Sequence, residues 1–377
     1  MTLPLSPPQP LRPEAPEPSG VKFPLSWLLE NSSVPIQYRA ITEVARGTLS
    51  PPQRLSVLPY SYPPALRLAL AQRADGTWGG LMLAVPAARS EPHDGIGTIV
   101  AVRRLLEYGW DRESPPLALA RRVLFRLLAE DEDPSYLFEL VPRGRLEPDA
   151  VRVGRAILRE AAAAVLAQAG YEDDPRLRGA ARRMVLRLDA FLRSPHVAKP
   201  FARVGNQHLL VPEAAPPSVH TLMMLAHMPL FRSEHYDTLD RLYTYLMQPV
   251  PRATAAVRVG RKIVAMPHLV MGDPLPHRNA ADADTPAALW WLEMLSRLGF
   301  LRRNENWGKL FDRFLDDCDQ RGVWESPKRA AVMRSANPFV WPSFPLEPHS
   351  SSEDRMANVT FRLGIIGRYA GRTLEIG

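Results

Sequence analysis

Glu107-Tyr108-Gly109-Trp110 closes an apolar helical run, and endings of this kind recur along the chain. Each ending joins the apolar run to a turn, often a glycine followed by an aromatic residue, and a second helical run begins after a short polar gap. The other endings are Ala45-Arg46-Gly47, Gln168-Ala169-Gly170-Tyr171, His227-Met228-Pro229, Arg297-Leu298-Gly299-Phe300 and Tyr369-Ala370-Gly371. Successive endings are 62, 61, 59, 70 and 72 residues apart. A long, nearly regular period indicates repeated helix pairs, each of which needs its neighbours to bury its apolar face.

Six such helix pairs predict an all-α protein in which the pairs close into a ring, an (α/α)6 toroid. The segments that lead from one pair to the next resemble one another, with a turn and a short apolar strip that tends to end in proline. They lie at 79–86, 142–148, 204–212 and 259–267. Gly-Asn and Gly-Arg between short apolar runs predict small β-hairpins. In a ring these hairpins would surround one mouth of a central cavity, where binding residues are usually carried.

The beginning of the chain has a different composition from the rest. Prolines stand at positions 4, 7, 8, 10, 13, 16 and 18, and proline at this density prevents helix formation and favours an extended segment. Residues 1–22 are therefore predicted to be a disordered tail. The remainder, 23–377, contains no stretch typical of a linker and is predicted to be a single toroid domain.

Charge and cysteine content narrow the class of protein. The chain has a net charge of +7, with 42 arginines against 5 lysines, but arginines such as Arg178, Arg182 and Arg183 are spaced as on a solvated helix face, so no nucleic-acid partner is expected. The single Cys318 excludes a disulfide framework. The chain shows neither a run of about 18 apolar residues nor the apolar core of a signal peptide. We therefore expect a cytoplasmic protein without a membrane span; no cofactor is predicted, and the sequence does not indicate a protein partner.

One turn carries a resemblance to a known superfamily. The segment Leu66-Arg67-Leu68-Ala69-Leu70-Ala71-Gln72-Arg73-Ala74-Asp75-Gly76-Thr77-Trp78 resembles the Gln-Trp repeat of squalene cyclases and related prenyltransferases. A degenerate copy is Phe314-Leu315-Asp316-Asp317-Cys318-Asp319-Gln320-Arg321-Gly322-Val323-Trp324. The resemblance implies the toroid of the terpenoid cyclase and protein prenyltransferase superfamily. In such a turn Gln72 bonds exposed helix-end carbonyls and Trp78 packs between helix pairs, so both are framework residues.

The same resemblance implies a candidate acid. Class II terpene cyclases protonate an alkene with an Asp-Xaa-Asp-Asp-Thr-Ala motif at the start of a helix that lines the cavity. Here Ala281-Asp282-Ala283-Asp284-Thr285-Pro286-Ala287 precedes a helix that bears Trp290 and Trp291, although Ala283 stands at the position of the proton-donating aspartate. Asp284 is the candidate catalytic acid, Asp282 the carboxylate that raises its pKa, and Trp290 and Trp291 would stabilise a carbocation. The alternative is that Asp284 caps the helix, with Pro286 in its first turn.

Other polar residues precede the first helix of each pair. His93, Asp94 and His220 are candidate ligand-binding residues, because a closed ring would bring them to one mouth, where they could serve acid–base work or hold a polar ligand. The further members of this set are Asp149, Glu213, His349, Glu353 and Asp354. The alternative is that helix starts attract such residues as caps. The types Asp316, Cys318 and His349 match the zinc ligands of protein prenyltransferases, but a lone cysteine is more often a buried small residue, and no metal site is predicted.

Three classes of function remain open. The first is a squalene- or terpene-cyclase-like toroid that acts on or binds an isoprenoid or another apolar ligand in its central cavity. The second is a non-catalytic toroid that binds a ligand or a protein, and the third is a carbohydrate-active (α/α)6 enzyme with two carboxylates about 5–10 Å apart on its rim. A cavity lined by Trp290, Trp291 and Tyr243 would favour the first class, and a filled centre would favour a scaffold.

Overall fold

A computed structural model describes residues 20–47, 55–87, 93–128, 148–276, 279–325, 335, 337–347 and 351–377. Most of the predicted tail, residues 1–19, lies outside these ranges. Strand β1 (Val21–Phe23) includes two residues assigned to that tail, and it pairs in parallel with strand β6 (Leu374–Ile376). Phe23 and Val21 are buried in the main core, so regular structure begins two residues before the predicted domain start.

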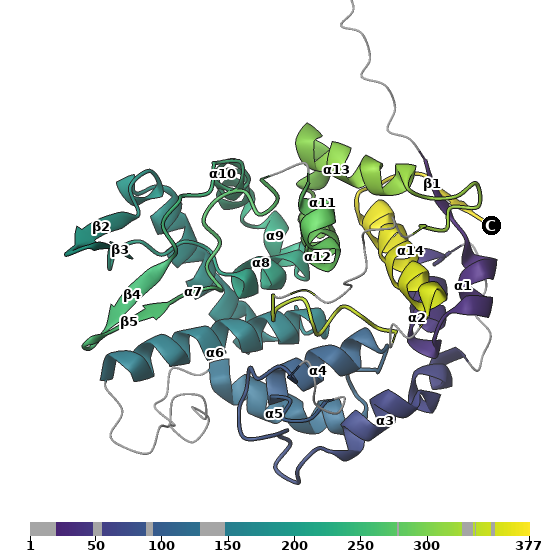
Figure 1. Ribbon diagram of the computed structural model, residues 1–377. Helices are drawn as coiled ribbons and strands as arrows, with labels where there is room; N and C mark the ends of the chain where they lie inside the picture. Colours follow the sequence, from purple (N-terminus) through teal and green to yellow (C-terminus); the bar gives the residue numbers. More distant parts are fainter. Residues whose placement is uncertain are drawn as a thin grey trace, which may run out of the picture.

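The described chain is mainly helical, which confirms the predicted all-α class (Figure 1). The first third contains α1 (Leu25–Asn31), α2 (Val34–Arg39), η1 (Ala40–Val44), η2 (Leu55–Ser61), α3 (Pro63–Leu70), α4 (Thr98–Glu107) and α5 (Pro115–Leu128). The middle contains α6 (Pro148–Gln168), α7 (Pro175–Leu192), η5 (Pro195–Val197), α8 (Val219–Ala226), α9 (Pro229–Ser233) and α10 (Tyr236–Leu246). The last part contains α11 (Ala280–Ala283), α12 (Thr285–Arg297), η6 (Leu301–Arg303), α13 (Glu305–Asp316) and α14 (Ser352–Tyr369).

The first helices of the predicted pairs pack against one another in chain order. Helix α4 contacts α6, α6 contacts α8, α8 contacts α12, α12 contacts α14, and α14 contacts α2 and η1. We call α2, η1, α4, α6, α8, α12 and α14 the inner helices. Every residue of α8 is buried, whereas α13 buries only one face, as expected for a helix with solvent on its other side. Helix α13, a second helix of a predicted pair, therefore has one face toward solvent.

The predicted helix endings are present. Gly109, Gly170 and Gly299 all adopt the left-handed conformation, with φ between 77° and 85°, which glycine accommodates without the steric cost of a Cβ atom. At Gly109 a Cβ atom would also lie 2.6 Å from the ring of Tyr38. The glycine at this ending is thus required both by the backbone and by the neighbouring helix.

The two Gln-Trp-like turns share one local structure. The backbone N–H of Trp78 donates to Thr98 Oγ1 at 3.0 Å, and that of Trp324 donates to Thr360 Oγ1 at 2.9 Å. Both indoles are 1% exposed. Gln72 donates to the carbonyls of Gly76 and Pro116 at 3.1 and 2.8 Å, which ties the end of α3 to the start of α5. The framework role predicted for Gln72 and Trp78 is therefore confirmed.

Two of the four predicted hairpins are present. Strands β2 (Phe201–Val204) and β3 (Gln207–Leu210) pair antiparallel, as do β4 (Ala256–Val259) and β5 (Lys262–Ala265). The two hairpins pack together over the first half of α6, where Leu210, Val259 and Met266 form a second apolar cluster. No strand is found at 79–86, and 142–147 lies outside the described residues. None of the helices in the described part of the chain combines the length and hydrophobicity needed to cross a bilayer.

Candidate functional site

A loop, residues 337–347, runs between the inner helices; we call it the strap. Figure 1 shows it as an unlabelled yellow-green segment between α4 and α14. Asn358 of α14 accepts hydrogen bonds from the backbone N–H groups of Leu346 and Glu347, and the Phe339 ring packs edge-on against His220 of α8. The strap therefore joins inner helices from distant parts of the chain.

The inner helices also meet in a buried network of charged side chains. Arg362 of α14 donates to Glu107 of α4 at 2.7 Å and to Glu293 of α12 at 2.8 Å. Arg39 of α2 donates to the same oxygen of Glu107 at 2.5 Å, and Arg297 donates to Glu293 at 2.9 Å. The side chains of Arg39, Arg362, Glu107 and Glu293 are at most 5% exposed. Buried charged side chains and the strap therefore lie where these inner helices meet.

The network keeps its carboxylates ionised. Burial by itself raises the pKa of Glu107, but the guanidinium groups of Arg39 and Arg362 outweigh it, so the pKa lies well below the ordinary value. Glu293 behaves in the same way beside Arg362 and Arg297, and its pKa is also lowered. Neither carboxyl group is therefore suited to donate a proton near neutral pH.

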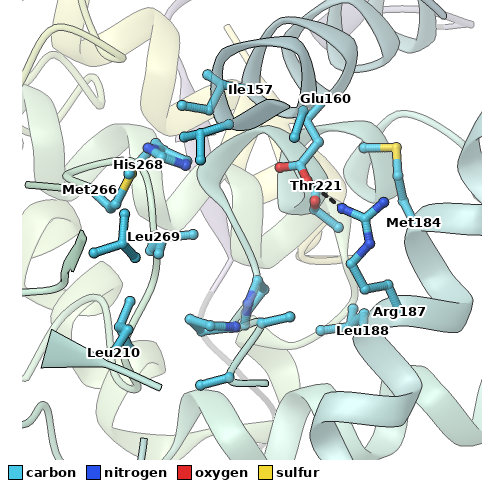
Figure 2. A pocket seen from close by; sticks show the side chains of 17 residues that line it. Ile157, Glu160, Met184, Arg187, Leu188, Leu210, Thr221, Met266, His268 and Leu269 are labelled. Atoms are coloured by element: carbon cyan, nitrogen blue, oxygen red, sulfur yellow. Dashed lines mark ion pairs between the residues drawn. The ribbon is translucent and has the colours of Figure 1, made fainter. Parts of the chain in front are cut away.

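A separate cavity of about 240 Å³ lies between the two hairpins, α6, α7 and the start of α8. Figure 2 shows its lining, which is mostly aliphatic and includes Ile157, Met184, Leu188 and Leu269. Its polar side chains are few: Glu160 and Arg187 on one side, Thr221 near them, and His268 on the opposite side. An apolar cavity with a few polar groups is the usual form of a small-molecule site.

Glu160 is the acidic group of this cavity. Burial raises the pKa of its carboxyl group, and hydrogen bonds from Ser218 and Thr221 and the charge of Arg187 only partly offset that effect. Ser218 Oγ donates to Glu160 Oε2 at 2.5 Å, and Arg187 Nη1 lies 3.7 Å from Oε1. Because Ser218 also caps α8, the start of that helix sets the orientation of the carboxyl group.

His268 faces Glu160 across the cavity, and its ring stacks on that of His220 with centroids 6.4 Å apart. Burial lowers the pKa of His268 to about 4 and that of His220 to about 3, where His268 and Arg103 add to the effect. Both imidazoles are therefore neutral near pH 7, and Nε2 of His220 has no hydrogen-bond partner. The cavity thus combines a carboxyl group of raised pKa with an imidazole of lowered pKa.

The structure gives the two candidate acids different partners. Asp284 Oδ1 accepts from the backbone N–H of Ala287 at 3.0 Å, and its Oδ2 accepts from Ser335 Oγ at 2.7 Å. Asp282 instead accepts two hydrogen bonds from Arg313 on the exposed surface. No hydrogen bond joins the two carboxyl groups, and Asp284 is the N-cap of α12, as in the alternative interpretation.

The helix cap gives a prediction that separates the two aspartates. We expect Asp284→Ala to lower the free energy of unfolding by about 1 kcal/mol, because it removes the α12 cap. Asp282→Ala is the matched control, and we expect a change below about 0.5 kcal/mol because its pair with Arg313 is exposed. Urea denaturation measures both changes. An equal effect of the two substitutions would contradict the cap role.

The two candidate tryptophans are buried rather than gathered around an open centre. Trp290 and Trp291 pack edge to face with centroids 4.9 Å apart, at 3% and 8% exposure. Trp291 lines a shallow hollow next to the second hairpin. Val250 and Met271 line the same hollow. Tyr243, in α10, donates to the carbonyl of Arg303 at 2.7 Å. Neither the 240 Å³ cavity nor this hollow is lined by all three aromatic residues.

The candidate ligand-binding residues His93, Asp94 and His220 also lie in different surroundings. His93 lies beside Tyr108 and Trp341 near the strap, Asp94 is exposed, and His220 is buried behind the wall of the 240 Å³ cavity. Burial, with Arg104 and Arg67, lowers the pKa of His93 to about 4. His349 lies outside the described residues.

Of the residues that match zinc ligands in type, Asp316 and Cys318 lie within the described ranges and His349 does not. Burial raises the pKa of the Cys318 thiol to about 12, and the thiol donates to the carbonyl of Phe314. Within the described ranges, no group of three or more histidine, cysteine, aspartate or glutamate side chains is placed to hold a metal ion.

Glu160 and His268 were not among the predicted site residues. In the sequence Glu160 stands within the alanine-rich second half of a helix, and His268 follows the proline that ends the second hairpin. A lone carboxylate on an otherwise apolar helix face was the available signal.

No family model matches the chain, and comparisons with curated proteins and with solved structures also give no match.

Proposed function

We propose that the inner helices close into an (α/α)6 ring with a packed centre, and that the protein binds a small apolar ligand outside that centre. The ring is supported by the succession of contacts from α4 through α14 to α2 and by the ion pair of Arg39 in α2 with Glu107 in α4. The ligand site is the cavity between the hairpins, α6, α7 and α8.

One observation carries the ligand proposal: a partly buried carboxyl group of raised pKa opens into a cavity whose lining is mostly aliphatic. Burial of a carboxyl group lowers the stability of the fold, so a wall with a purely structural role would not need one. The carboxyl group can accept a hydrogen bond from a hydroxyl group, or donate one to an oxygen when it is protonated, and the aliphatic side chains bury the rest of the molecule. The proposed ligand is therefore apolar with a single oxygen-bearing end, a description that a short isoprenoid alcohol meets.

The size of the cavity limits the ligand. At about 240 Å³ it is somewhat smaller than the roughly 300–1,000 Å³ common for drug-sized ligands. A chain of about ten carbons suits this volume better than a thirty-carbon polyene. The proposal accordingly moves the ligand away from the centre and makes it smaller than the substrate of a squalene cyclase.

Calorimetric titration with geraniol, a ten-carbon isoprenoid alcohol, tests the proposal. We expect Ala156→Phe, which fills the cavity, to weaken binding at least about tenfold, and Glu160→Leu to weaken it about five- to thirtyfold through loss of one hydrogen bond to a buried group. Ala190→Phe, at an exposed position of α7, is the control and should bind like the wild type. The proposal fails if geraniol does not bind or if Ala156→Phe binds it unchanged.

A further inference from the structure

Two adjacent arginines of α4 differ from the other buried arginines. Arg103 and Arg104 are each 5% exposed, and neither forms an ion pair with any carboxylate of the described residues. Arg103 donates to the carbonyl of Phe339 and to Ser343 Oγ at 3.2 and 3.3 Å. Arg104 donates to the carbonyls of Trp341 and Pro342 at 3.2 and 3.3 Å. All of these partners belong to the strap.

The other arginines of the network have carboxylate partners of their own. Arg39, Arg297 and Arg362 are paired with the carboxylates of Glu43, Glu107 and Glu293. The guanidinium of Arg104 lies over the rings of Tyr108 and Trp341, 4.6 and 4.9 Å from their centroids, which stabilises its charge in part. Within the described ranges neither Arg103 nor Arg104 has an ion-paired carboxylate, and burial of a guanidinium without one is unfavourable.

The bonds to the strap satisfy the two arginines only in part. They lie at the long end of the hydrogen-bond range, and Nε of both side chains has no partner. The pKa of Arg103 is lowered to about 10, chiefly by burial and despite the nearby Glu107 and Glu293. Guanidinium groups present a planar fork of donors that suits the oxygens of a phosphate, and each is permanently charged.

We propose that Arg103 and Arg104 form a binding site for the phosphate group of a small molecule, and that the strap occupies this site in the present structure. A phosphate monoester carries about two negative charges near pH 7, which the two guanidinium groups can pair with. The three strap carbonyls hold the positions that phosphate oxygens would take. This proposal is independent of the apolar cavity, since neither arginine lines it.

Because the strap and the phosphate compete for the same donors, binding displaces residues 339–343 from the two arginines. The end of the strap near Leu346 stays attached through Asn358. Val340 is fully buried, Trp341 lies against Arg104 and Ser343 donates to Glu107, and the packing of Phe339 against His220 opposes the displacement as well. Loosening that contact should therefore favour the anion.

Titration calorimetry of the full chain with inorganic phosphate, at constant ionic strength, tests the site. We expect the double variant Arg103→Met/Arg104→Met to bind phosphate at least about tenfold more weakly than the wild type. Circular dichroism of this variant checks that it still folds. The control Arg182→Met/Arg183→Met removes an adjacent exposed pair on α7 and should leave the affinity unchanged, which excludes a general effect of net charge.

Phe339→Ala gives a second test that leaves both arginines in place. We expect it to bind phosphate several-fold more tightly, and we expect phosphate to increase amide hydrogen exchange in residues 339–343 of the wild type. Absence of phosphate binding by the wild type, equal affinity in the Arg103→Met/Arg104→Met variant, or unchanged affinity in Phe339→Ala would each overturn the proposal.

Discussion

Arg362→Met is expected to lower the free energy of unfolding by about 5 kcal/mol. Arg362 bridges Glu107 and Glu293 and also donates to the carbonyl of Ser343. Its loss leaves two buried carboxylates short of a partner, and removing one member of a buried ion pair costs about 3–5 kcal/mol because the remaining charge is uncompensated. The measurement is urea denaturation followed by circular dichroism at neutral pH.

Two further variants show whether the loss of stability in Arg362→Met comes from the buried network. Arg313→Met removes the exposed partner of Asp282, and we expect a loss below about 1 kcal/mol. Adding Glu293→Met to Arg362→Met removes one of the stranded charges, so the double variant should regain part of the lost stability. A loss of less than about 1 kcal/mol in Arg362→Met would show that the network is not a buried, mutually dependent set.

Mild acid is expected to destabilise the protein through its histidines of lowered pKa. Burial is the largest cause of the lowered pKa of four histidines: about 4 for His93 and His268, and about 3 for His220 and His227. The ordinary value is 6.5. Below pH 6.5 the unfolded chain therefore binds protons that the folded chain does not, so stability falls as the pH decreases toward the folded pKa. Each buried imidazole accounts for a loss of up to about 2 kcal/mol between pH 6.5 and 5.

His227→Gln isolates one of these contributions. Besides burial, the charge of Arg297 lowers the pKa of His227, and the ring bonds to the carbonyl of Met223 at 2.9 Å. We expect the loss of stability between pH 7 and pH 5 to be about 2 kcal/mol smaller in this variant than in the wild type. His208→Gln, on the exposed hairpin, should not change the pH profile. Denaturation at a series of pH values decides between them, and identical profiles would contradict the assignment.

Local features of the fold could be predicted because their signals are local. A glycine at the end of an apolar run marks a left-handed residue, and Gly109 and Gly170 have that conformation. Gly205 and Gly260, between short apolar strips, mark the two hairpins. The spacing of Gln72 and Trp78 is enough to predict a turn that packs its indole inward. Each of these depends on residues a few positions apart, so the sequence by itself determined them.

Which charged side chains meet in the interior was decided only by the tertiary structure. Glu107 and Arg362 are 255 residues apart, and each alone resembles a solvated charge on a helix. Only the packing of the inner helices brings them together away from water, which turns ordinary surface residue types into a buried network. The same holds for Glu160 and His268, which come from α6 and from the end of the second hairpin. Asp282 and Asp284, adjacent in the sequence pattern, instead face different partners, because the start of α12 takes one as its cap and leaves the other to Arg313.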